Sequence, residues 1–171
     1  MNNVKITSGK YRGRTLFTPG GKTHPMGARE KLALLNMIAA YLPDANVLDA
    51  YAGSGALGVE ALSRGAKNVI FIEKNPKAAQ IIRQNLANLG IEAEVFQDAV
   101  KNYQSEKLFD VILADPPYDC FDLTEASNLV KNLSSEGVFA LSHPGDAPNI
   151  PGLTLEKSRQ YAGATLSIYS K

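Results

Sequence analysis

Short apolar stretches alternate with amphipathic stretches along most of the chain, and the two kinds predict different elements. The apolar stretches are rich in Val, Ile, Leu and Phe and predict β-strands over residues 46–51, 68–73, 94–97, 109–115 and 137–142. The amphipathic stretches predict helices over residues 28–41, 56–64, 76–89 and 123–133, with a short helix or turn over 99–104. Strands that alternate with helices indicate a doubly wound, mostly parallel sheet. We therefore predict an α/β protein with a Rossmann-like fold.

The two ends of the chain break this alternation. Residues 4–7 and 14–17 predict a β-hairpin, and the Gly- and Pro-rich stretch 18–27 predicts a loop. Residues 153–158 and 164–170 predict two more strands, which favour an antiparallel edge to the sheet. We expect one α/β domain over residues 28–171, with a hairpin-and-loop extension over residues 1–27.

The composition is that of one globular domain. The chain has 171 residues, of which 44% are hydrophobic, and this is enough for a full-sized core. It has no apolar run of 18 residues and no signal-peptide pattern, so we expect no membrane association. A single cysteine, Cys120, rules out an internal disulfide and favours a reducing, cytoplasmic location. Two histidines and one cysteine give no zinc spacing, so we expect no metal site.

Charge is distributed unevenly. The net charge is +1, but residues 1–31 carry seven Lys and Arg against one acidic residue, a net +6 that leaves −5 for the remainder. A basic extension on a mildly acidic body is typical of a protein that binds a polyanion. The alternative is a solvated hairpin with ordinary surface cations.

A glycine-rich turn follows the first predicted strand of the domain. Residues Asp49 to Gly58 read D-A-Y-A-G-S-G-A-L-G, so the glycines also fit the dinucleotide pattern G-x-G-x-x-G. Glycines allow the backbone to approach a ligand at the carboxyl end of a strand. Asp49 would repel a pyrophosphate but would attract a cofactor that carries an ammonium and a sulfonium group. The turn therefore favours S-adenosylmethionine (SAM) over a nicotinamide dinucleotide, and its candidate cofactor-binding residues are Asp49, Ala50, Tyr51, Gly53, Ser54 and Gly55.

Acidic residues also end the next two predicted strands. Glu73, followed by Lys74, can accept hydrogen bonds from both hydroxyls of a ribose. Asp98 can accept from an adenine amino group, and the Ala99 N–H can reach a ring nitrogen. Each acid alone also fits a helix N-cap. Three acids at three successive strand ends favour a shared ligand.

The segment Asp115-Pro116-Pro117-Tyr118 follows the strand predicted over residues 109–115 and resembles the D/N-P-P-Y/F motif of SAM-dependent amino-methyltransferases. An exocyclic NH2 is a poor nucleophile, because its lone pair is delocalised into the base. Asp115 and a backbone carbonyl within the prolines can each accept one of its N–H groups, which aims the lone pair at the methyl donor. Proline fixes the carbonyl beforehand, and Tyr118 can stack on the base. The alternative is a strand that ends in a proline turn with a packing tyrosine.

The whole pattern resembles the bacterial 16S ribosomal RNA guanine-N2 methyltransferases, the RsmD-like group. The resemblance covers nearly the whole chain and is carried by residues 9–14, 29–32, 49–64, 115–118 and 161–165. It implies SAM at the residues named above and the target guanine at Asp115, Pro116, Pro117 and Tyr118. It also implies that the basic extension contacts RNA, with Lys10, Arg12, Arg14, Lys22 and Arg29 as candidates. The implied partner is 16S rRNA or an assembly intermediate of the small ribosomal subunit, bound by a monomer.

Other functions stay open at this point. Methyltransferases that act on adenine N6 in DNA or RNA, or on a protein amide, use related motifs to bind an NH2 group. A nicotinamide oxidoreductase would need catalytic partners that do not follow the glycine turn. A non-catalytic RNA-binding assembly factor would not need the D-P-P-Y segment.

Overall fold

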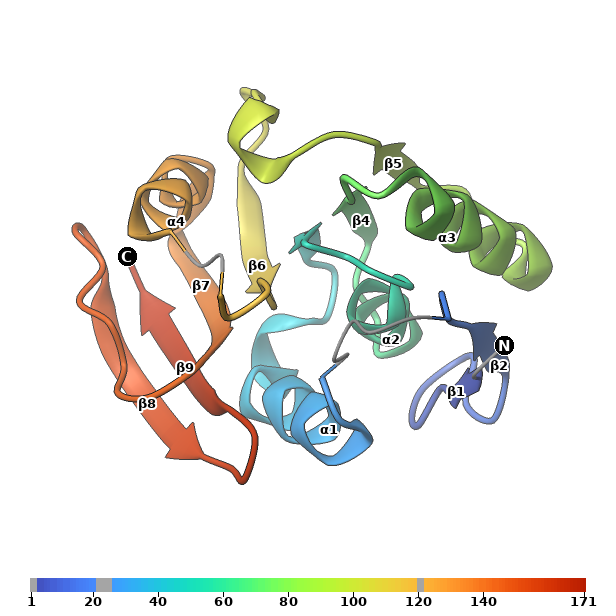
Figure 1. Ribbon diagram of the computed structural model, residues 1–171, viewed down its shortest axis with the longest axis horizontal. Helices are drawn as coiled ribbons and strands as arrows, with labels where there is room; N and C mark the ends of the chain where they lie inside the picture. Colours follow the sequence, from blue (N-terminus) through green and yellow to red (C-terminus); the bar gives the residue numbers. More distant parts are fainter. Residues whose placement is uncertain (1–2, 21–25, 120–121) are drawn as a thin grey trace.

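The computed structural model describes residues 3–20, 26–119 and 122–171. Its centre is a seven-stranded sheet in the order β5-β4-β3-β6-β7-β9-β8 (Figure 1). The sheet strands are β3 (Asn46–Ala50), β4 (Asn68–Ile72), β5 (Glu94–Phe96), β6 (Phe109–Ala114), β7 (Leu133–His143), β8 (Thr154–Gln160) and β9 (Thr165–Ser170). The helices are α1 (Ala28–Met37), α2 (Ala56–Ser63), α3 (Pro76–Leu89) and α4 (Leu123–Val130), with 3-10 turns η1 (Ala39–Tyr41) and η2 (Val100–Asn102). The hairpin strands are β1 (Asn3–Lys5) and β2 (Thr15–Phe17).

The pairing confirms the predicted mostly parallel sheet. Strands β5, β4, β3, β6 and β7 pair in parallel, and β9 pairs antiparallel with both β7 and β8. The antiparallel pairing predicted for this edge is therefore present. The reversed strand β9 lies second from the edge, because β8 covers its outer side.

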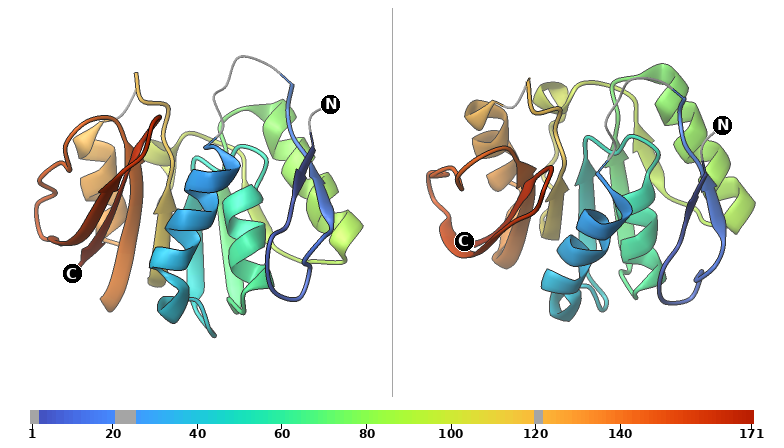
Figure 2. Two further views of the ribbon diagram at one scale, coloured as in Figure 1. Left: turned by 90° about the horizontal axis from the view of Figure 1, so that it is seen from below. Right: turned by 60° about the horizontal axis from the view of Figure 1, so that its bottom comes forward.

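Alternate residues of each strand face opposite sides of the sheet, as the strand period of two requires. Val47, Phe71 and Val111 pack with α1, α2, α3 and the hairpin on one face. Leu48 and Ile112 pack with α4 and η2 on the other. Figure 2 shows α1 and α2 lying in front of the sheet when it is seen from the first of these faces. The sheet is thus covered on both sides, which is what parallel strands need.

Some predicted boundaries are wrong. The helix predicted over residues 28–41 ends at Met37 and is followed by the 3-10 turn η1. The helix predicted over residues 123–133 ends at Val130, and β7 begins at Leu133 instead of Gly137. Asn132 explains the difference. Its side-chain amide donates to the carbonyls of Ser105 and Lys107, and its own carbonyl accepts from the Phe109 N–H. These bonds tie the chain to the start of β6, so the helix cannot continue through this position.

The predicted hairpin is fixed to the body of the protein through Glu60 of α2. The Glu60 side chain is fully buried and accepts hydrogen bonds from the backbone and hydroxyl of Thr7 and from the Ser8 N–H. It also forms ion pairs with Arg64 at 3.4 Å and with Lys31 at 3.9 Å. Burial lowers the pKa of Lys31, and the Glu60 charge opposes that shift. Lys31 is therefore part of an internal network and does not contribute to the basic surface.

The hairpin turn has no room for a side chain at Gly9. A Cβ added there would lie 1.7 Å from the Ser63 carbonyl oxygen, which accepts the Lys10 N–H at 2.8 Å. The Ser63 hydroxyl accepts from the Tyr11 N–H. At the far end of the hairpin, the Asn85 side chain accepts the Phe17 N–H and donates to the Phe17 carbonyl. The hairpin is thus hydrogen-bonded along its length to α2 and α3 (Figure 1).

Candidate active site

The candidate site lies where the strand order reverses. The chain leaves β3 toward β4 on one side and leaves β6 toward β7 on the other. In open α/β sheets the ligand-binding crevice lies at such a point, which here is the carboxyl ends of β3 and β6. Ala50 is paired with Ala114 at these ends, so Tyr51 and Asp115 are the next residues of two adjacent strands. The glycine turn and the D-P-P-Y segment therefore lie side by side.

Asp49 lies beneath the glycine turn. Its Oδ2 accepts the Gly58 N–H at 2.8 Å, and the residue is only 1% exposed. A Cβ on Gly58 would lie 2.4 Å from the Phe71 ring, so only glycine permits this close approach of α2. Burial raises the pKa of Asp49 to about 7, the Gly58 hydrogen bond opposes the rise, and the charges of Asp115 and Glu73 add to it. Because Asp49 is almost fully buried, the attraction predicted between it and a cationic cofactor would act mainly through its charge.

Glu73 connects the glycine turn to the end of β4. Its Oε2 accepts the Gly53 N–H and its Oε1 accepts the Asn75 N–H, both at 2.7 Å. Each oxygen keeps a further lone pair, as hydrogen bonding to ribose hydroxyls requires. The Ser54 carbonyl accepts from the Asn85 side chain, which holds the turn from the α3 side. Lys74 is exposed beside Glu73.

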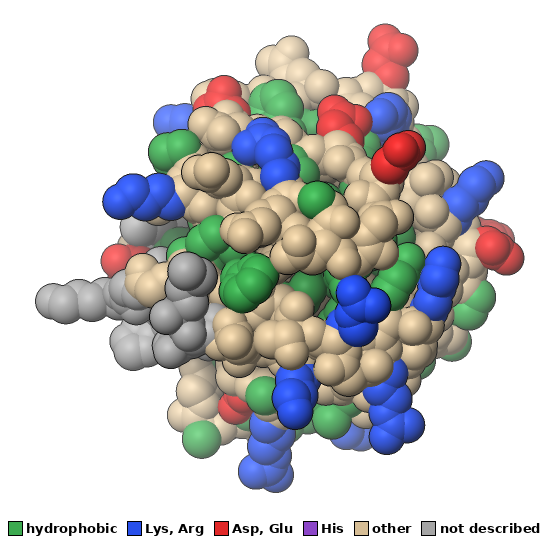
Figure 3. Space-filling model, turned by 90° about the vertical axis from the view of Figure 1, so that its right-hand side faces the viewer, with side chains coloured by type: hydrophobic (Ala, Val, Ile, Leu, Met, Phe, Trp, Pro, Cys, Tyr) green, Lys and Arg blue, Asp and Glu red, His purple; other side chains and the backbone are tan. Residues whose placement is uncertain are grey.

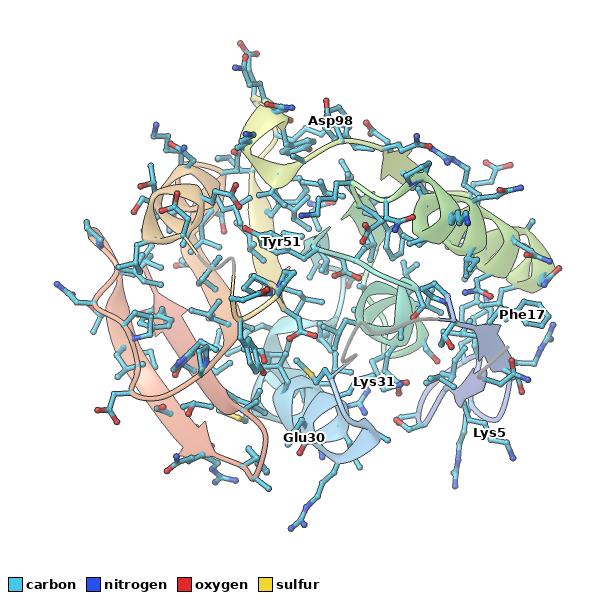
Figure 4. The ribbon with its side chains drawn as sticks, viewed as in Figure 1. Lys5, Phe17, Glu30, Lys31, Tyr51 and Asp98 are labelled. Carbon is cyan, nitrogen blue, oxygen red and sulfur yellow. The ribbon has the colours of Figure 1, made fainter. Side chains whose placement is uncertain are left out.

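Asp98 and Ala99 lie after β5, at the outer part of the same rim. Figure 4 shows Asp98 toward β5 and Tyr51 nearer the middle of the sheet. The Asp98 Oδ1 accepts from the Asn102 side chain and from the Ala99 N–H, and these two bonds lower the pKa of this exposed carboxylate. The Ala99 N–H, predicted to reach an adenine nitrogen, is thus already donated to Asp98. An adenine at this position would have to compete for it.

Tyr51 extends from the glycine turn to α4. Its φ is 64°, a left-handed conformation that costs a residue with a side chain of the order of 1–3 kcal/mol. Its hydroxyl donates to Glu125 Oε2 at 2.6 Å. Burial raises the pKa of Tyr51, and the hydrogen bond and charge of Glu125 add to the shift. The bond joins the predicted cofactor turn to the helix that follows the D-P-P-Y segment.

Asp115 is a half-buried carboxylate at the end of β6. Burial raises its pKa to about 6, while hydrogen bonds from the Ser142 hydroxyl and the Met26 N–H lower it. Pro116 is buried and Pro117 is exposed. The Tyr118 ring is 38% exposed, which leaves it open for stacking, and its hydroxyl lies 2.7 Å from the Ser142 Oγ. At neutral pH, Asp115 is therefore mostly ionised and can accept a hydrogen bond.

Several residues of the site are absent from the sequence-based prediction, among them Met26, Glu125 and Ser142, as well as Asn75, Asn85 and Asn102. Ser142 had a signal, because it ends the strand predicted over residues 137–142 and ligand-binding groups gather at the carboxyl ends of such strands. Glu125 lies in a predicted helix, and Met26 lies in a predicted loop. Neither the helix pattern nor the loop composition shows which distant residue the side chain or backbone contacts.

The candidate RNA-binding residues lie on two elements. Lys10 and Arg12 are exposed at the hairpin turn, and the exposed Arg14 donates to the Asn88 carbonyl of α3. Arg29 is exposed on α1, and Lys22 lies outside the described residues. Figure 3 shows the side of the molecule that carries the hairpin, and Lys and Arg side chains stand out in its lower half. A cavity of about 380 Å³ lies between the hairpin and the end of α2, where Lys10, Tyr11 and Lys67 are among its lining residues.

Within residues 3–20, 26–119 and 122–171, His, Cys, Asp and Glu side chains form no group of three or more that could hold a metal ion. The helices of the same ranges include none with the length and apolar character of a membrane span.

Known proteins with similar sequences and folds include several methyltransferases. The Ribosomal RNA small subunit methyltransferase D of Haemophilus influenzae is 39% identical over 130 residues, which cover 71% of this chain and 67% of that protein. The Putative rRNA methyltransferase YlbH of Bacillus subtilis is 31% identical over 182 residues, covering 98% of this chain and 99% of the relative. The solved structure of the putative methyltransferase yhhF from Escherichia coli superposes with a TM-score of 0.88 at 31% identity, over 99% of this chain and 98% of that one. The family described as Conserved hypothetical protein 95 matches residues 4–170, so the chain belongs to this family, the RsmD-like methyltransferases.

Proposed function

We propose that this protein transfers a methyl group from SAM to the exocyclic N2 of a guanine in 16S rRNA. The substrate would be the RNA itself or an assembly intermediate of the small ribosomal subunit. Membership of the family supports methyl transfer to ribosomal RNA, since relatives from two organisms carry that activity in their names. The cofactor, the base and the atom are inferred from the site.

The observation that carries the proposal is the adjacency of the two predicted half-sites. Tyr51 begins the glycine turn and Asp115 begins the D-P-P-Y segment, and they follow paired residues of neighbouring strands. A cofactor on the turn and a base on the segment would therefore meet across one strand spacing, about 4.8 Å. Alignment of two reactants at close range can lower a barrier by about 7–11 kcal/mol. Positioning is then the main contribution of the protein.

SAM, when bound, supplies an electrophilic methyl group. The backbone of Gly53 to Gly55 and the Glu73 carboxylate would hold its methionine and ribose parts, and Asp98 would accept from its adenine. The negative charge of Asp49 below the turn favours a cationic ligand over a phosphate. These acceptors are prearranged, since Glu73 and Asp98 are each held by two backbone or side-chain donors.

The target base would be held by the D-P-P-Y segment. The Asp115 carboxylate accepts one N–H of the amino group and the Pro116 carbonyl accepts the other, so the nitrogen lone pair points at the methyl donor. Tyr118 stacks on the base, an interaction worth about 1–3 kcal/mol. Because Asp115 has a pKa of about 6, it is ionised at neutral pH and can also take the proton that the methylated nitrogen releases.

The basic hairpin would bind RNA phosphates remote from the target base, because its turn packs against Ser63, at the end of α2 that is farthest from the glycine turn. A base must leave its stack to enter a site of this kind, and backbone contacts outside the site stabilise that arrangement. Lys10 and Arg12 are exposed and lie on a hairpin that is hydrogen-bonded to the body. They can therefore position the RNA relative to the crevice.

Methyl transfer can be tested by single-turnover reactions with labelled SAM and undermethylated 16S RNA or small subunits. Digestion to nucleosides should show label in N2-methylguanosine. Asp115→Ala should reduce the rate by about 10²–10³ or more, the usual cost of one preorganised electrostatic contact. It should leave thermal stability and SAM affinity unchanged. Asp119→Ala, which removes an exposed carboxylate four residues away, is the matched control.

Each other outcome points to a different function. Label in N6-methyladenosine or in ribosomal protein would identify one of the related amino-methyltransferases. RNA binding without any transfer by the wild-type protein would favour a non-catalytic assembly factor. A stable Asp115→Ala variant with normal turnover would contradict the assigned role of the D-P-P-Y segment.

A further inference from the structure

A single hydroxyl group connects the two side chains that would hold the target base. Ser142 lies near the end of β7, the strand next to β6, and it is fully buried. Its Oγ lies 2.7 Å from the Tyr118 hydroxyl, and its hydroxyl also lowers the pKa of the neighbouring Asp115. Ser142 itself is too deeply buried to contact a base.

The chemistry of a hydroxyl fixes the direction of these bonds. A serine has one O–H to donate and two lone pairs to accept with. The ionised Asp115 can only accept, so Ser142 donates to Asp115 and accepts from the Tyr118 O–H. The result is an ordered chain, Tyr118 to Ser142 to Asp115, that begins at the exposed ring and ends on the carboxylate.

This chain of hydrogen bonds restricts the side chains at both of its ends, Tyr118 and Asp115. Tyr118 is 38% exposed, and the bond from its hydroxyl to a buried partner restricts the orientation of the ring. Hydrogen bonds from the Ser142 hydroxyl and from the Met26 N–H both lower the pKa of Asp115. A stacking ring and an acceptor that share one anchor keep a fixed relation to each other.

We propose that Ser142 is a positioning residue for methyl transfer, whose hydroxyl holds the Tyr118 ring and the Asp115 carboxylate in one geometry. This role rests on the proposed function, because it concerns the orientation of the base that the D-P-P-Y segment would bind. It assigns a use to the Tyr118 hydroxyl, which stacking alone does not need.

The test compares Ser142→Ala, Tyr118→Phe and the double variant in steady-state methyl transfer to 16S RNA. Ser142→Ala should lower kcat about 10- to 100-fold, the scale expected when reacting groups are no longer aligned. Tyr118→Phe keeps the ring, breaks the same chain and cannot create a core defect, so it should lower kcat in the same direction. The double variant should be no slower than the slower single variant. SAM affinity should stay within about twofold of wild type in all three variants. The proposed cofactor site is separate from Ser142 and Tyr118, and changes at separate sites do not influence each other.

The pH profile separates positioning from a general loss of structure. Removing Ser142 removes a donor to Asp115, so the acid limb of kcat/KM should move to higher pH than in the wild type. The other titratable groups here are Asp49 in β3, Tyr118 itself and Glu30 in α1, whose charge acts on Tyr118. Ser142→Ala retains all of them, and Tyr118→Phe loses only the Tyr118 hydroxyl. Ser167→Ala is the matched control, because it removes another fully buried serine hydroxyl, one that bonds His143 instead.

The outcomes are distinct. A folded Ser142→Ala variant with normal kcat and an unmoved acid limb would overturn the inference, and so would multiplicative reductions in the double variant. An equal reduction in Ser167→Ala would show a general structural effect and would also overturn it. Absence of methyl transfer by the wild-type enzyme would overturn the proposed function first, and the role of Ser142 with it.

Discussion

Asp49 and Asp115 are both acids with raised pKa values, but their surroundings give them different tasks. Asp49 is covered by α2 and meets no solvent, so its charge is felt by the crevice without direct contact. Asp115 borders the crevice and is ionised above about pH 6. The Asp115 charge helps to raise the pKa of Asp49 to about 7. A cation bound above Asp49 would stabilise the ionised form of Asp49.

We predict that SAM binding depends on the ionisation of Asp49. In the free protein Asp49 is protonated below pH 7, and a cationic ligand lowers its pKa, so binding releases a proton. Affinity should rise by about tenfold between pH 5.5 and 7, as linkage requires for one group with a pKa near 7. Calorimetry in buffers of different ionisation enthalpy would measure both the affinity and the proton release.

Asp49→Asn is the control for this prediction. It should bind SAM more weakly at pH 7 and show little change across the same range. The amino group of the ligand stays protonated there, because an α-amino group has a pKa of about 7.7–8.0. A wild-type affinity that does not change with pH would contradict the proposed electrostatic role of Asp49.

The acids at the strand ends could be predicted from the sequence, because the residue at which an apolar run ends can be recognised there. Glu73 and Asp115 follow apolar runs, and the structure has both at the rim of one crevice. Their partners could not be predicted. Ser142 and Met26 reach Asp115 from segments 27 and 89 positions away in the sequence, and hydrogen bonds over such separations leave no periodic signal.

At the scale of elements, the accuracy of each boundary follows from its local signals. Helix α3 runs from Pro76 to Leu89, as predicted, because its ends are encoded locally: the Asn75 side chain caps its first turn, Pro76 occupies the first helical position, and Gly90 ends it in a left-handed conformation. The end of α4 has no such signal. It is set by the contacts of Asn132 with the chain before β6, which only the fold brings together.

The hairpin is a rigid element because its turn fits closely against α2. We predict that Gly9→Ala lowers the free energy of unfolding by more than the cost of a left-handed alanine, which is about 1–2 kcal/mol. The added methyl would meet the Ser63 carbonyl and displace the turn. Chemical denaturation and limited proteolysis of the hairpin would show the effect.

Gly13→Ala is a matched control from the same turn. Gly13 has a φ of +83°, close to the +77° of Gly9, but a Cβ there meets nothing within 4 Å. Gly13→Ala should therefore lower the free energy of unfolding only by the cost of a left-handed alanine, and the hairpin should stay docked. Equal effects of the two substitutions would show that the contact with Ser63 does not hold the hairpin.

At the scale of the whole molecule, charge separates into two regions. Acids surround the crevice, including Asp49, Glu73, Asp98, Asp115 and Glu125. Several Lys and Arg side chains are exposed on the side that carries the hairpin, with a few acids among them (Figure 3). Such a distribution attracts a cationic cofactor to the crevice and repels phosphates from it. RNA would therefore be held mainly at the side, with one base entering the crevice.

We predict that the exposed hairpin cations supply RNA affinity without influencing the cofactor. Replacing Lys5, Lys10 and Arg12 by Ala should raise KM for RNA and flatten the salt dependence of binding, by about 0.7–0.9 in the log–log slope for each phosphate that is no longer neutralised. Arg14 is kept, because its bond to α3 helps to dock the hairpin. Fluorescence anisotropy over a salt series would measure the slope, and calorimetry should show unchanged SAM affinity.

The control removes the same number of cations at the opposite end of the sheet. Lys131 follows α4, and Lys157 and Arg159 are exposed on β8. Their replacement should leave the salt slope unchanged. Equal slopes for the two triple variants would mean that RNA binding does not depend on the hairpin.

The bonds that dock the hairpin join residues 52 to 74 positions apart in the chain. A ribosome adds about 5–20 residues per second, so the hairpin sequence precedes its docking partners by about 3–15 seconds. An isolated two-stranded hairpin is at best marginally stable. The proposed RNA-binding surface therefore forms only after α2 and α3 have been synthesised. A nascent chain that carries the basic segment alone has no assembled face to offer to the ribosomal RNA around it.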